Sequence, residues 1–300
     1  MLFSVIIPVY NKAAYLDRAL DCLEAQECTD WEAVLVDDGS TDESLSIARR
    51  RESDRIRVFA QDNAGAGAAR NTAMANARGD IFAFLDADDL WHPYHLQALA
   101  EVFAAFPDTG IASTRWALLE DVAEAHVPTG GEVRQVDYLS LMADTSGYFN
   151  SISTAIRRGV YEQLGGMKLY KRGEDVEYWT RIGAQFSAAI NTSLTSYYDI
   201  SQDPKNHRII GSDFSGLECT RRNYTPVVQT LYDLVADGVP VNQISLERYV
   251  DHRISIGLLA AARRREWGRV VQLLRIVDNI PRMVSDRLRR RQAERARRES

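Results

Sequence analysis

The first hundred residues alternate between two hydrophobic patterns, and this alternation limits the fold more than any other feature of the sequence. Short apolar runs typical of buried strands are separated by segments whose large apolar residues recur at helical spacing. Strands that alternate with helices are joined by right-handed crossovers and form a mostly parallel sheet with helices on both faces. The sequence therefore predicts an α/β fold. The expected strands are "FSVIIPVY" (3–10), "WEAVLVD" (31–37), "RIRVFA" (55–60) and "IFAFLD" (81–86).

The pattern changes farther along the chain. Between about 110 and 205, short strand-like segments such as "IASTRWALL", "AAI" and "LTSYYDI" are mixed with loops, and a helix is expected near 174–184. From about 211 onward the pattern is helical, and Pro281 is expected to start or kink a last Arg-rich helix. We therefore expect an α/β domain over 1–210 and a helical C-terminal region over 211–300.

The composition indicates a soluble protein of a reducing compartment, and we expect it to be cytoplasmic. The sequence has 300 residues, of which 45% are hydrophobic and 26% charged, as in ordinary globular proteins. Cys22, Cys28 and Cys219 have no zinc-like spacing, and their odd number argues against a disulfide framework. The N-terminal apolar run lacks a basic leader and soon reaches Pro8, so we expect a strand and not a signal peptide.

The net charge of −6 conceals an uneven distribution. Residues 263–300 contain 13 arginines against five acidic residues, so this segment carries +8 and the remainder −14. A solvated helical tail is the commoner interpretation of such a segment. The alternative is a basic surface that holds the protein at the inner face of the cell membrane through anionic lipid. Nucleic acid is not an expected partner, because the acidic body would repel it.

Two of the expected strands end in acidic residues. "VLVDDGSTD" supplies Asp37 and Asp38, and "FAFLDADD" supplies Asp86 and Asp88. Turn and capping chemistry would explain either segment alone, but ligands of open parallel sheets bind outside the carboxyl ends of the strands. Asp86 and Asp88 would project the same way from extended backbone. A magnesium or manganese ion, held by one or two carboxylates and substrate phosphates, would relieve their repulsion.

A glycine-containing segment, "NAGAGAARN" (63–71), follows the third expected strand. It lacks the third glycine of a dinucleotide-binding fingerprint, so we reject a Rossmann-type dehydrogenase. Arg70 beside the start of a helix has two interpretations: it contacts phosphate, or it is a solvated helix residue.

Four segments together resemble the motif series of family 2 glycosyltransferases with a GT-A fold. The resemblance implies a Rossmann-like central sheet and transfer of a sugar from a nucleotide donor, commonly a UDP-sugar, with inversion at the anomeric carbon. It also implies a divalent cation, Mn²⁺ or Mg²⁺, and a saccharide or lipid-linked glycan acceptor in the synthesis of surface polysaccharides or glycoconjugates. The segments, in order between residue 4 and about residue 184, are "SVIIPVYNKAAYLDRALDCLEAQ", "WEAVLVDDGSTD", "NAGAGAARNTAMANARGDIFAFLDADD" and "GGMKLYKRGEDVEYWTRI".

The resemblance assigns four residues to the donor. Pro8 and Tyr10 match positions beside the nucleotide base, and Asp38 matches the aspartate that recognises uracil. Arg70 matches an arginine on the diphosphate side. We expect these residues to bind the nucleotide part of the donor.

The resemblance also assigns the metal ligands and the base. Asp86 and Asp88 match the D-x-D motif, with Asp86 at the ribose and metal and Asp88 the closer metal ligand. Asp175 matches the catalytic base, and Glu174 beside it is a second catalytic candidate. Acidic residues at a helix start also stabilise the helix dipole by ~0.3–1 kcal/mol, so only the resemblance favours Asp175 as a base. His207, in a segment where the family varies, is a further candidate metal ligand, although a surface loop is the simpler interpretation.

Other polar residues have structural explanations. Glu177 and Arg181 fit an i,i+4 ion pair. For His92 and His95, the aromatic neighbours and Pro93 favour packing or a loop over metal binding.

Two other functions remain open. One is a nucleotide-sugar-binding protein without turnover. The other, less favoured, is a sugar-phosphate nucleotidyltransferase, which would carry a Gly-rich loop with Arg and Lys where this sequence has "PVYNKAAY". No motif identifies the donated sugar or the acceptor, and assembly into a homo-oligomer is left open.

Overall fold

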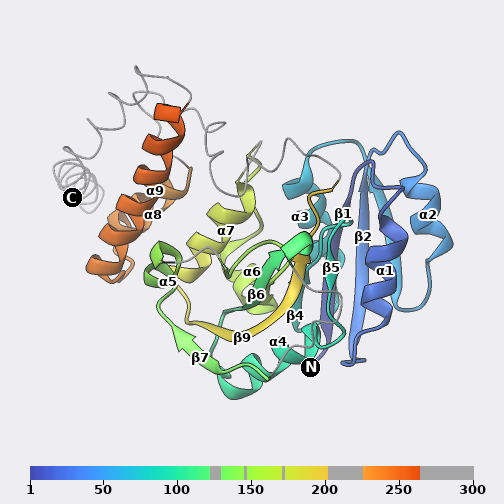
Figure 1. The fold of residues 1–300 in the computed structure, drawn as a ribbon, viewed down its shortest axis with the longest axis horizontal. Coiled ribbons are helices and arrows are strands. Elements are labelled where there is room, and N and C mark those ends of the chain that lie inside the picture. Colours follow the sequence, from blue (N-terminus) through green and yellow to red (C-terminus); the bar gives the residue numbers. More distant parts are fainter. Residues whose placement is uncertain (122–129, 145–146, 171–172, 202–225, 264–300) are drawn as a thin grey trace, which may run out of the picture. The chain divides into compact units, whose positions relative to one another are not determined.

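A computed structural model describes residues 1–121, 130–144, 147–170, 173–201 and 226–263 (Figure 1). They form two compact units. The first contains the described residues of 1–138 and 147–201, and the second contains 139–144 and 226–263. No helix in these described ranges combines the length and apolar character needed to cross a membrane.

The first half of the sheet is parallel, and the expected α/β fold is confirmed. Four strands lie in the order β3-β2-β1-β4, and every pair among them is parallel. The expected strand ranges agree with the observed ones to within two residues at each end. The strands are β1 (Phe3–Val9), β2 (Trp31–Asp38), β3 (Ile56–Gln61) and β4 (Ile81–Phe84), and the helices that connect them are α1 (Leu16–Glu24), α2 (Ser44–Arg50) and α3 (Ala66–Asn76).

The second half of the sheet is mixed. β8 (Thr154–Arg157) pairs antiparallel with both β4 and β6 (Ile111–Leu118), and β6 runs parallel to β9 (Ala188–Tyr198). β5 (Leu90–Trp91) and β7 (Val133–Val136) are short and pair antiparallel with β9. The helices of this half are α4 (His95–Ala105), α5 (Tyr138–Asp144), α6 (Arg158–Leu164) and α7 (Glu174–Gly183), and Leu119–Asp121 form a single 3-10 turn.

β9 differs from the sequence-based expectation of two separate short strands. It is one strand of 11 residues, and its middle contains polar residues that are nevertheless buried. Asn191 is fully buried. Its burial is tolerated because its amide donates to the Ala98 carbonyl at 3.4 Å and to the Glu101 carboxylate at 3.1 Å. Polar side chains with internal partners therefore continue the strand where hydrophobicity alone suggested a break.

Alternate residues of the central strands face two opposite layers. Val5 and Ile7 of β1 belong to one apolar cluster with Leu16 and Leu20 of α1. On the other face α3 packs against β1 and β2. There Phe84 of β4 also lies edge-to-face with Trp179 of α7, their ring centroids 4.8 Å apart. Helices thus cover both faces of the sheet, as expected.

The second unit contains α5 from Leu139 onward together with α8 (Pro226–Ala236) and α9 (Gln243–Arg263). Arg248 of α9 forms an ion pair with Asp144 at the end of α5. The candidate metal ligand His207 and the expected Arg-rich helix after Pro281 lie outside the described residues.

The carboxyl ends of three neighbouring strands meet at one edge of the sheet. β1 lies between β2 and β4, with Val9 opposite Asp37 and Ile6 opposite Phe84. The chain runs from β1 to β2 and β3 on one side of β1 and then crosses to β4 on its other side, and open parallel sheets bind ligands where the strand order reverses in this way. The acidic segments after β2 and β4 both lie at this edge.

Candidate active site

The acidic segment after β4 forms a turn. β4 ends at Phe84, and the backbone N–H of Asp89 donates to the carbonyl of Asp86 at 3.1 Å. The expectation that Asp86 and Asp88 project together from extended backbone is therefore wrong. The physical reason is that the pairing of β4 with β8 stops at Ala83 and its pairing with β1 stops at Phe84, so no ladder holds Asp86 and Asp88 extended. Burial raises the pKa of Asp88, the ammonium of Lys12 opposes this, and the nearby charge of Asp86 adds to it.

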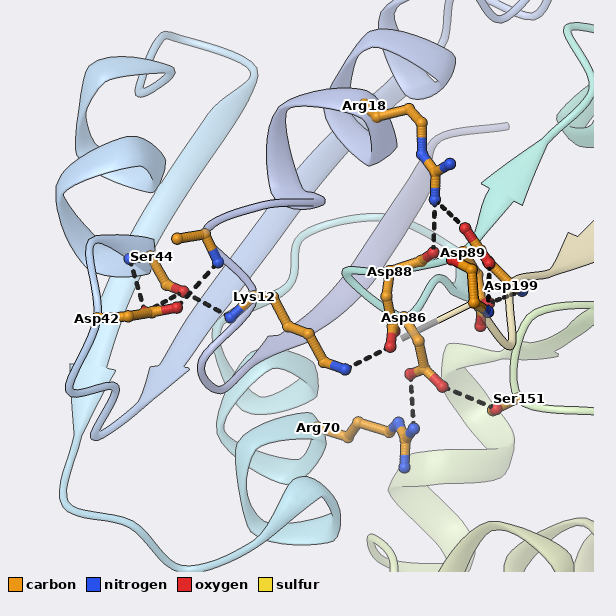
Figure 2. Close-up of polar contacts among 12 residues, drawn as sticks. Lys12, Arg18, Asp42, Ser44, Arg70, Asp86, Asp88, Asp89, Ser151 and Asp199 are labelled. Atoms are coloured by element: carbon orange, nitrogen blue, oxygen red, sulfur yellow. Dashed lines mark hydrogen bonds and ion pairs between the residues drawn. The ribbon is translucent and has the colours of Figure 1, made fainter. Parts of the chain in front are cut away.

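Arg70 of α3 joins this turn to the start of α7, and Figure 2 shows its contact with Asp86. Its Nη2 donates to Asp86 Oδ1 at 2.6 Å, and its Nη1 donates to Glu174 Oε1 at 3.1 Å. Burial alone would lower the pKa of Arg70, but the charges of Asp86, Asp175 and Glu174 raise it above its usual value. Only 4% of Arg70 is exposed, so of its two interpretations the solvated helix residue is wrong. The second oxygen of Asp86 accepts from the Ser151 hydroxyl at 3.1 Å.

Lys12, which sequence analysis did not single out, binds Asp88. Its ammonium forms an ion pair with Asp88 Oδ2 (Figure 2). The backbone N–H of Lys12 donates to Ser44 Oγ at 2.7 Å. A signal for this role was present, since Lys12 is a basic residue in the loop that leaves the carboxyl end of β1.

Asp89 and Asp199 form the third part of the cluster, and sequence analysis also missed both roles. Asp89 is 1% exposed; its Oδ1 accepts from the backbone N–H of Asp199 at 2.8 Å. Its Oδ2 has no hydrogen-bond partner among the described residues. Burial and the charges of Asp88 and Asp86 raise the pKa of Asp89 well above its usual value. Arg18 pairs with Asp199 and donates to the Asp88 carbonyl at 3.2 Å (Figure 2).

Glu174 and Asp175 begin α7 immediately after Gly173, whose φ of 76° is left-handed. Burial and the charge of Asp175 raise the pKa of Glu174, and Arg70 opposes this. Burial also raises the pKa of Asp175 against the effect of Arg70. The two helix starts approach closely, because a Cβ on Gly67 of α3 would lie 3.0 Å from Glu174 Cγ. The structure thus brings both candidate catalytic carboxylates beside the D-x-D turn.

Asp38 holds the loop between β3 and α3. Its Oδ1 accepts from Gln61 Nε2 at 2.7 Å and from the N–H of Ala64 at 3.0 Å, while its Oδ2 accepts from the N–H of Gly65 at 2.8 Å. Its neighbour Asp37 is equally buried, and Oδ1 of Asp37 has no hydrogen-bond partner among the described residues. Recognition of uracil by Asp38 stays a prediction.

Pro8 and Tyr10 lie at the same edge of the sheet. Pro8 is half-buried near the end of β1 and stands opposite Val36 of β2. Tyr10 follows the strand and is 47% exposed. Both are therefore next to the acidic end of β2, and their contact with a base stays a prediction.

A divalent cation fits the donor set of this cluster, although within the described residues no three His, Cys, Asp or Glu side chains are placed to hold a metal ion. Magnesium is commonly held by one or two carboxylates together with substrate phosphates, so three protein ligands are not required. Carboxylates outnumber basic side chains here, and burial together with the neighbouring negative charges raises the pKa values of Asp88 and Asp89. Asp89 Oδ2, which is buried and has no hydrogen-bond partner among the described residues, also fits a site for a cation. The oxygen donors are of the type that Mg²⁺ and Mn²⁺ prefer.

Relatives of known sequence are glycosyltransferases by name. A protein of Nostoc sp. strain PCC 7120, named as an uncharacterized glycosyltransferase, is 45% identical over 114 residues, which cover 37% of this chain and 35% of the relative. A Bacillus subtilis strain 168 glycosyltransferase named for teichuronic acid biosynthesis, TuaG, is 38% identical over 116 residues, or 36% of this chain and 46% of the relative. The matched part thus spans between about a third and a half of these relatives.

Solved structures show the same fold. Residues 1–349 of S. aureus TarS in complex with UDP-GlcNAc superpose with a TM-score of 0.58 at 20% identity, covering 93% of this chain and 92% of that fragment. The mannosyltransferase PcManGT from Pyrobaculum calidifontis, in complex with GDP-Man and Mn²⁺, superposes with a TM-score of 0.55 at 19% identity, covering 92% and 86%. At these identities the likeness shows the fold, and the expected GT-A architecture is confirmed.

The motifs, the fold and the clustering of Arg70, Asp86 and Glu174 agree with one further finding. A family model described as "Glycosyl transferase family 2" matches residues 4–165, more than half of the 300 residues. The chain therefore belongs to glycosyl transferase family 2.

Proposed function

We propose that the protein is a divalent-metal-dependent, inverting glycosyltransferase. In this proposal it moves a sugar from a nucleotide-sugar donor, with UDP as the nucleotide, to a hydroxyl of a saccharide or lipid-linked glycan in surface polysaccharide or glycoconjugate synthesis. Family membership supports sugar transfer. The choice of UDP as the donor nucleotide is supported by the complex of TarS with UDP-GlcNAc. GDP is the first alternative, because PcManGT was solved with GDP-Man.

One observation carries the proposal: Arg70 holds Asp86 at the sheet edge and Glu174 at the start of α7 in one buried network. Displacing a nucleoside diphosphate requires charge neutralisation on the leaving side and a carboxylate near the attacking hydroxyl. Asp86 and Glu174, 88 residues apart in the sequence, bring these two requirements into a single cluster. A turn or capping role for either acidic segment alone would not bring them together.

The metal side of the reaction is assigned to the turn after β4. Asp88 would be the closer ligand, and Asp86 would contact ribose and metal. A bound divalent cation would act as a Lewis acid that offsets the negative charge developing on the leaving diphosphate. Asp86 is already oriented for this by Arg70 and Ser151, which each bind one of its oxygens.

The base is assigned to Asp175. The acceptor oxygen attacks the anomeric carbon on the face opposite the diphosphate, the bond to the diphosphate breaks, and the hydroxyl proton passes to the Asp175 carboxylate. Glu174 is committed to Arg70 at 3.1 Å, so we assign it a positioning role beside the base. A base whose pKa is raised toward neutrality takes a proton more effectively, and burial raises the pKa of Asp175.

The nucleotide is assigned to Pro8, Tyr10 and Asp38 at the ends of β1 and β2. Arg70 has both Nη atoms bound to carboxylates, so we propose that it supports the diphosphate through Asp86. Two alternatives remain, a binding protein without turnover and a sugar-phosphate nucleotidyltransferase. A binding experiment and a turnover experiment together separate them from a glycosyltransferase.

A panel of nucleotides tests the donor. UDP, GDP, dTDP and ADP would each be added with and without Mn²⁺ to the native protein, to Asp88→Ala and to Asp54→Ala, an exposed control. A ligand at a hundred times its Kd stabilises by about 2.7 kcal/mol, or several degrees in Tm. We expect UDP to protect only with Mn²⁺, and only when Asp88 is present. If GDP alone raised the Tm, GDP would take the place of UDP as the proposed donor nucleotide. If no nucleotide raised the Tm, the proposal that the protein binds a nucleotide donor would be contradicted.

Turnover separates an enzyme from a binding protein. Release of UDP from a set of UDP-sugars, followed by mass spectrometry, should be seen with the native protein and be lost in Asp175→Asn, while donor binding persists. Release of pyrophosphate from a nucleoside triphosphate and a sugar phosphate would indicate a nucleotidyltransferase instead.

We also propose that the protein acts in the cytoplasm and that the Arg-rich end contacts the inner face of the membrane. The support is the charge of +8 over residues 263–300, where each basic residue near an anionic surface contributes about 1 kcal/mol. Co-sedimentation with anionic vesicles at moderate salt tests this. Unchanged binding after deletion of 282–300 would reject it.

A further inference from the structure

The loop between β1 and α1 is fixed against the loop that precedes α2. Three successive backbone N–H groups of the first loop donate to side chains of the second loop and of Ser44, the first residue of α2, so the backbone of the first loop has little freedom. Burial alone would raise the pKa of Asp42, but hydrogen bonds from Ser44 and Ala13 lower it and keep the carboxylate charged. The three pairs are Asn11 with Ser40 Oγ at 3.0 Å, Ala13 with Asp42 Oδ2 at 3.1 Å, and Lys12 with Ser44 Oγ at 2.7 Å, the last of which Figure 2 shows.

The direction of this loop is set at Asn11. Its φ of 51° is left-handed, a conformation that asparagine tolerates better than most residues. Its Oδ1 accepts from the backbone N–H of Thr41 at 2.8 Å. This turn directs Lys12, the next residue, toward the end of β4.

The ammonium of Lys12 reaches the carboxylate assigned to the metal. Lys12 Nζ pairs with Asp88 Oδ2 across 76 residues of sequence. The two side chains are 30% and 20% exposed. Both side chains therefore keep contact with solvent, so a competing cation can reach Asp88 and displace the ammonium.

We propose that Lys12 is a built-in competitor of the divalent cation for Asp88, so that the cation binds tightly only together with the nucleoside diphosphate. This inference rests on the metal assignment in the proposed function. An ammonium held on Asp88 weakens the binding of a divalent cation to the same carboxylate, because the two positive charges repel at contact distance and share one negative charge. The diphosphate brings the negative charge that shifts the exchange toward the cation.

Coupled binding has a functional consequence. Linkage requires that whatever makes nucleotide strengthen cation binding also makes the cation strengthen nucleotide binding by the same factor. As the diphosphate product leaves, Lys12 can return to Asp88 and weaken the hold on the cation. The enzyme would then release cation and product together, and the acidic cluster would not retain a cation without donor.

The experiment measures cation binding directly. The Kd of Mn²⁺ is obtained from the electron paramagnetic resonance signal of the free ion, without nucleotide and with saturating UDP. The proteins are the native chain, two neutral variants (Lys12→Met and Lys12→Gln), Lys12→Arg, and Arg50→Met. Arg50 is an exposed residue of α2, so Arg50→Met makes the same change in net charge away from Asp88. Circular dichroism and thermal unfolding establish that each variant folds.

We expect the neutral Lys12 variants to bind Mn²⁺ at least about tenfold more tightly without nucleotide, a change of about 1.4 kcal/mol. Lys12→Arg and Arg50→Met should match the native chain. The factor by which UDP strengthens Mn²⁺ binding should fall correspondingly in the neutral variants. A purely structural role for Lys12 would lower thermal stability and leave the Mn²⁺ Kd unchanged.

Two results would overturn the inference, and they are distinguishable. If UDP strengthens Mn²⁺ binding in the native chain but the neutral variants bind Mn²⁺ alone no better than it does, Lys12 does not compete and the proposed function stands. If the native chain binds no Mn²⁺ with or without UDP, the metal assignment fails and this inference fails with it.

Discussion

Arg70 and Glu174 lie 104 residues apart in the sequence, yet Arg70 Nη1 is 3.1 Å from Glu174 Oε1. The side chain of Arg70 is 5% exposed and also binds Asp86. Removing one partner of a buried ion pair leaves an uncompensated charge and typically costs 3–5 kcal/mol. Because Asp86 keeps 21% exposure, we expect Arg70→Met to lower the free energy of unfolding by about 3 kcal/mol.

Urea unfolding followed by circular dichroism measures this change. Arg70→Lys should lose less, because it keeps the charge but cannot donate to both carboxylates in the fork geometry of arginine. Arg50→Met on the exposed face of α2 should stay within about 0.5 kcal/mol of the native chain. Equal losses for Arg70→Met and Arg50→Met would mean that the buried network adds no stability.

Replacing the two acidic residues at the start of α7 should separate their roles. Asp175→Asn removes the assigned base, so kcat should fall about 10²–10⁴-fold while the Kd for donor stays unchanged. Glu174→Gln keeps Asp175, so it should retain measurable turnover, and its kcat should fall less than that of Asp175→Asn. Steady-state kinetics and donor titration provide both values. The opposite ranking would transfer the role of base to Glu174.

The acid side of the pH profile should reflect Asp175. Its pKa is raised by burial, so the carboxylate becomes protonated and inactive as pH falls through a value above the ordinary ~3.9 of an aspartate. The positive charge of Arg70 opposes that rise, so Arg70→Met should move the acid limb of kcat/KM to higher pH, and Arg70→Lys should not. An acid limb that is the same in both variants would show that another group controls it.

The elements were predictable from the sequence because their signals are local. Apolar runs identified the strands of the parallel half, and the i,i+4 spacing identified the Glu177–Arg181 pair, which the structure shows at 3.2 Å. The expected packing role of His95 is confirmed as well, since it is fully buried.

The candidate site was only partly predictable, because its contacts depend on tertiary topology. The motifs indicated Arg70 and Asp86, but no local pattern shows that Asp89 lies against the N–H of Asp199, 110 residues away. The bond between Lys12 and Asp88 likewise requires the parallel pairing of β1 with β4. Residues brought together by strand order need the three-dimensional arrangement to be found.

Asn71, the neighbour of Arg70 in α3, fixes the loop before α7. Its amide donates to the carbonyl of Met167 at 2.8 Å and accepts from the N–H of the same residue at 2.7 Å. Each buried backbone group left without a partner costs about 1–3 kcal/mol. We therefore expect Asn71→Ala to lose about 2–4 kcal/mol in urea unfolding. Asn71→Asp, which keeps only the acceptor, should fall between Asn71→Ala and the native chain, and an equal loss in both would exclude the paired hydrogen bonds as the cause.

His95 should make the protein less stable in mild acid. It is fully buried, its ring stacks on Trp91 with centroids 4.1 Å apart, and its Nδ1 lies 2.9 Å from Thr195 Oγ1. Burial, with a smaller effect of His92, lowers the pKa of His95 from 6.5 to about 3. Between these two values the unfolded chain binds a proton that the folded chain does not. The contribution is therefore fully present above about pH 6.5 and is lost as pH falls toward 3.

The size of this effect follows from linkage. A group that titrates at 6.5 only in the unfolded state should remove about 2 kcal/mol from the free energy of unfolding between pH 7.5 and pH 5. His95→Asn keeps a polar group near Thr195 but does not titrate. It starts less stable at pH 7.5 because the stacking on Trp91 is lost, yet its stability should decline less between the two pH values. Urea unfolding of both proteins at pH 7.5 and pH 5 makes the comparison. Identical declines would mean that His95 takes up a proton in the folded state, which its burial against Trp91 and Thr195 argues against.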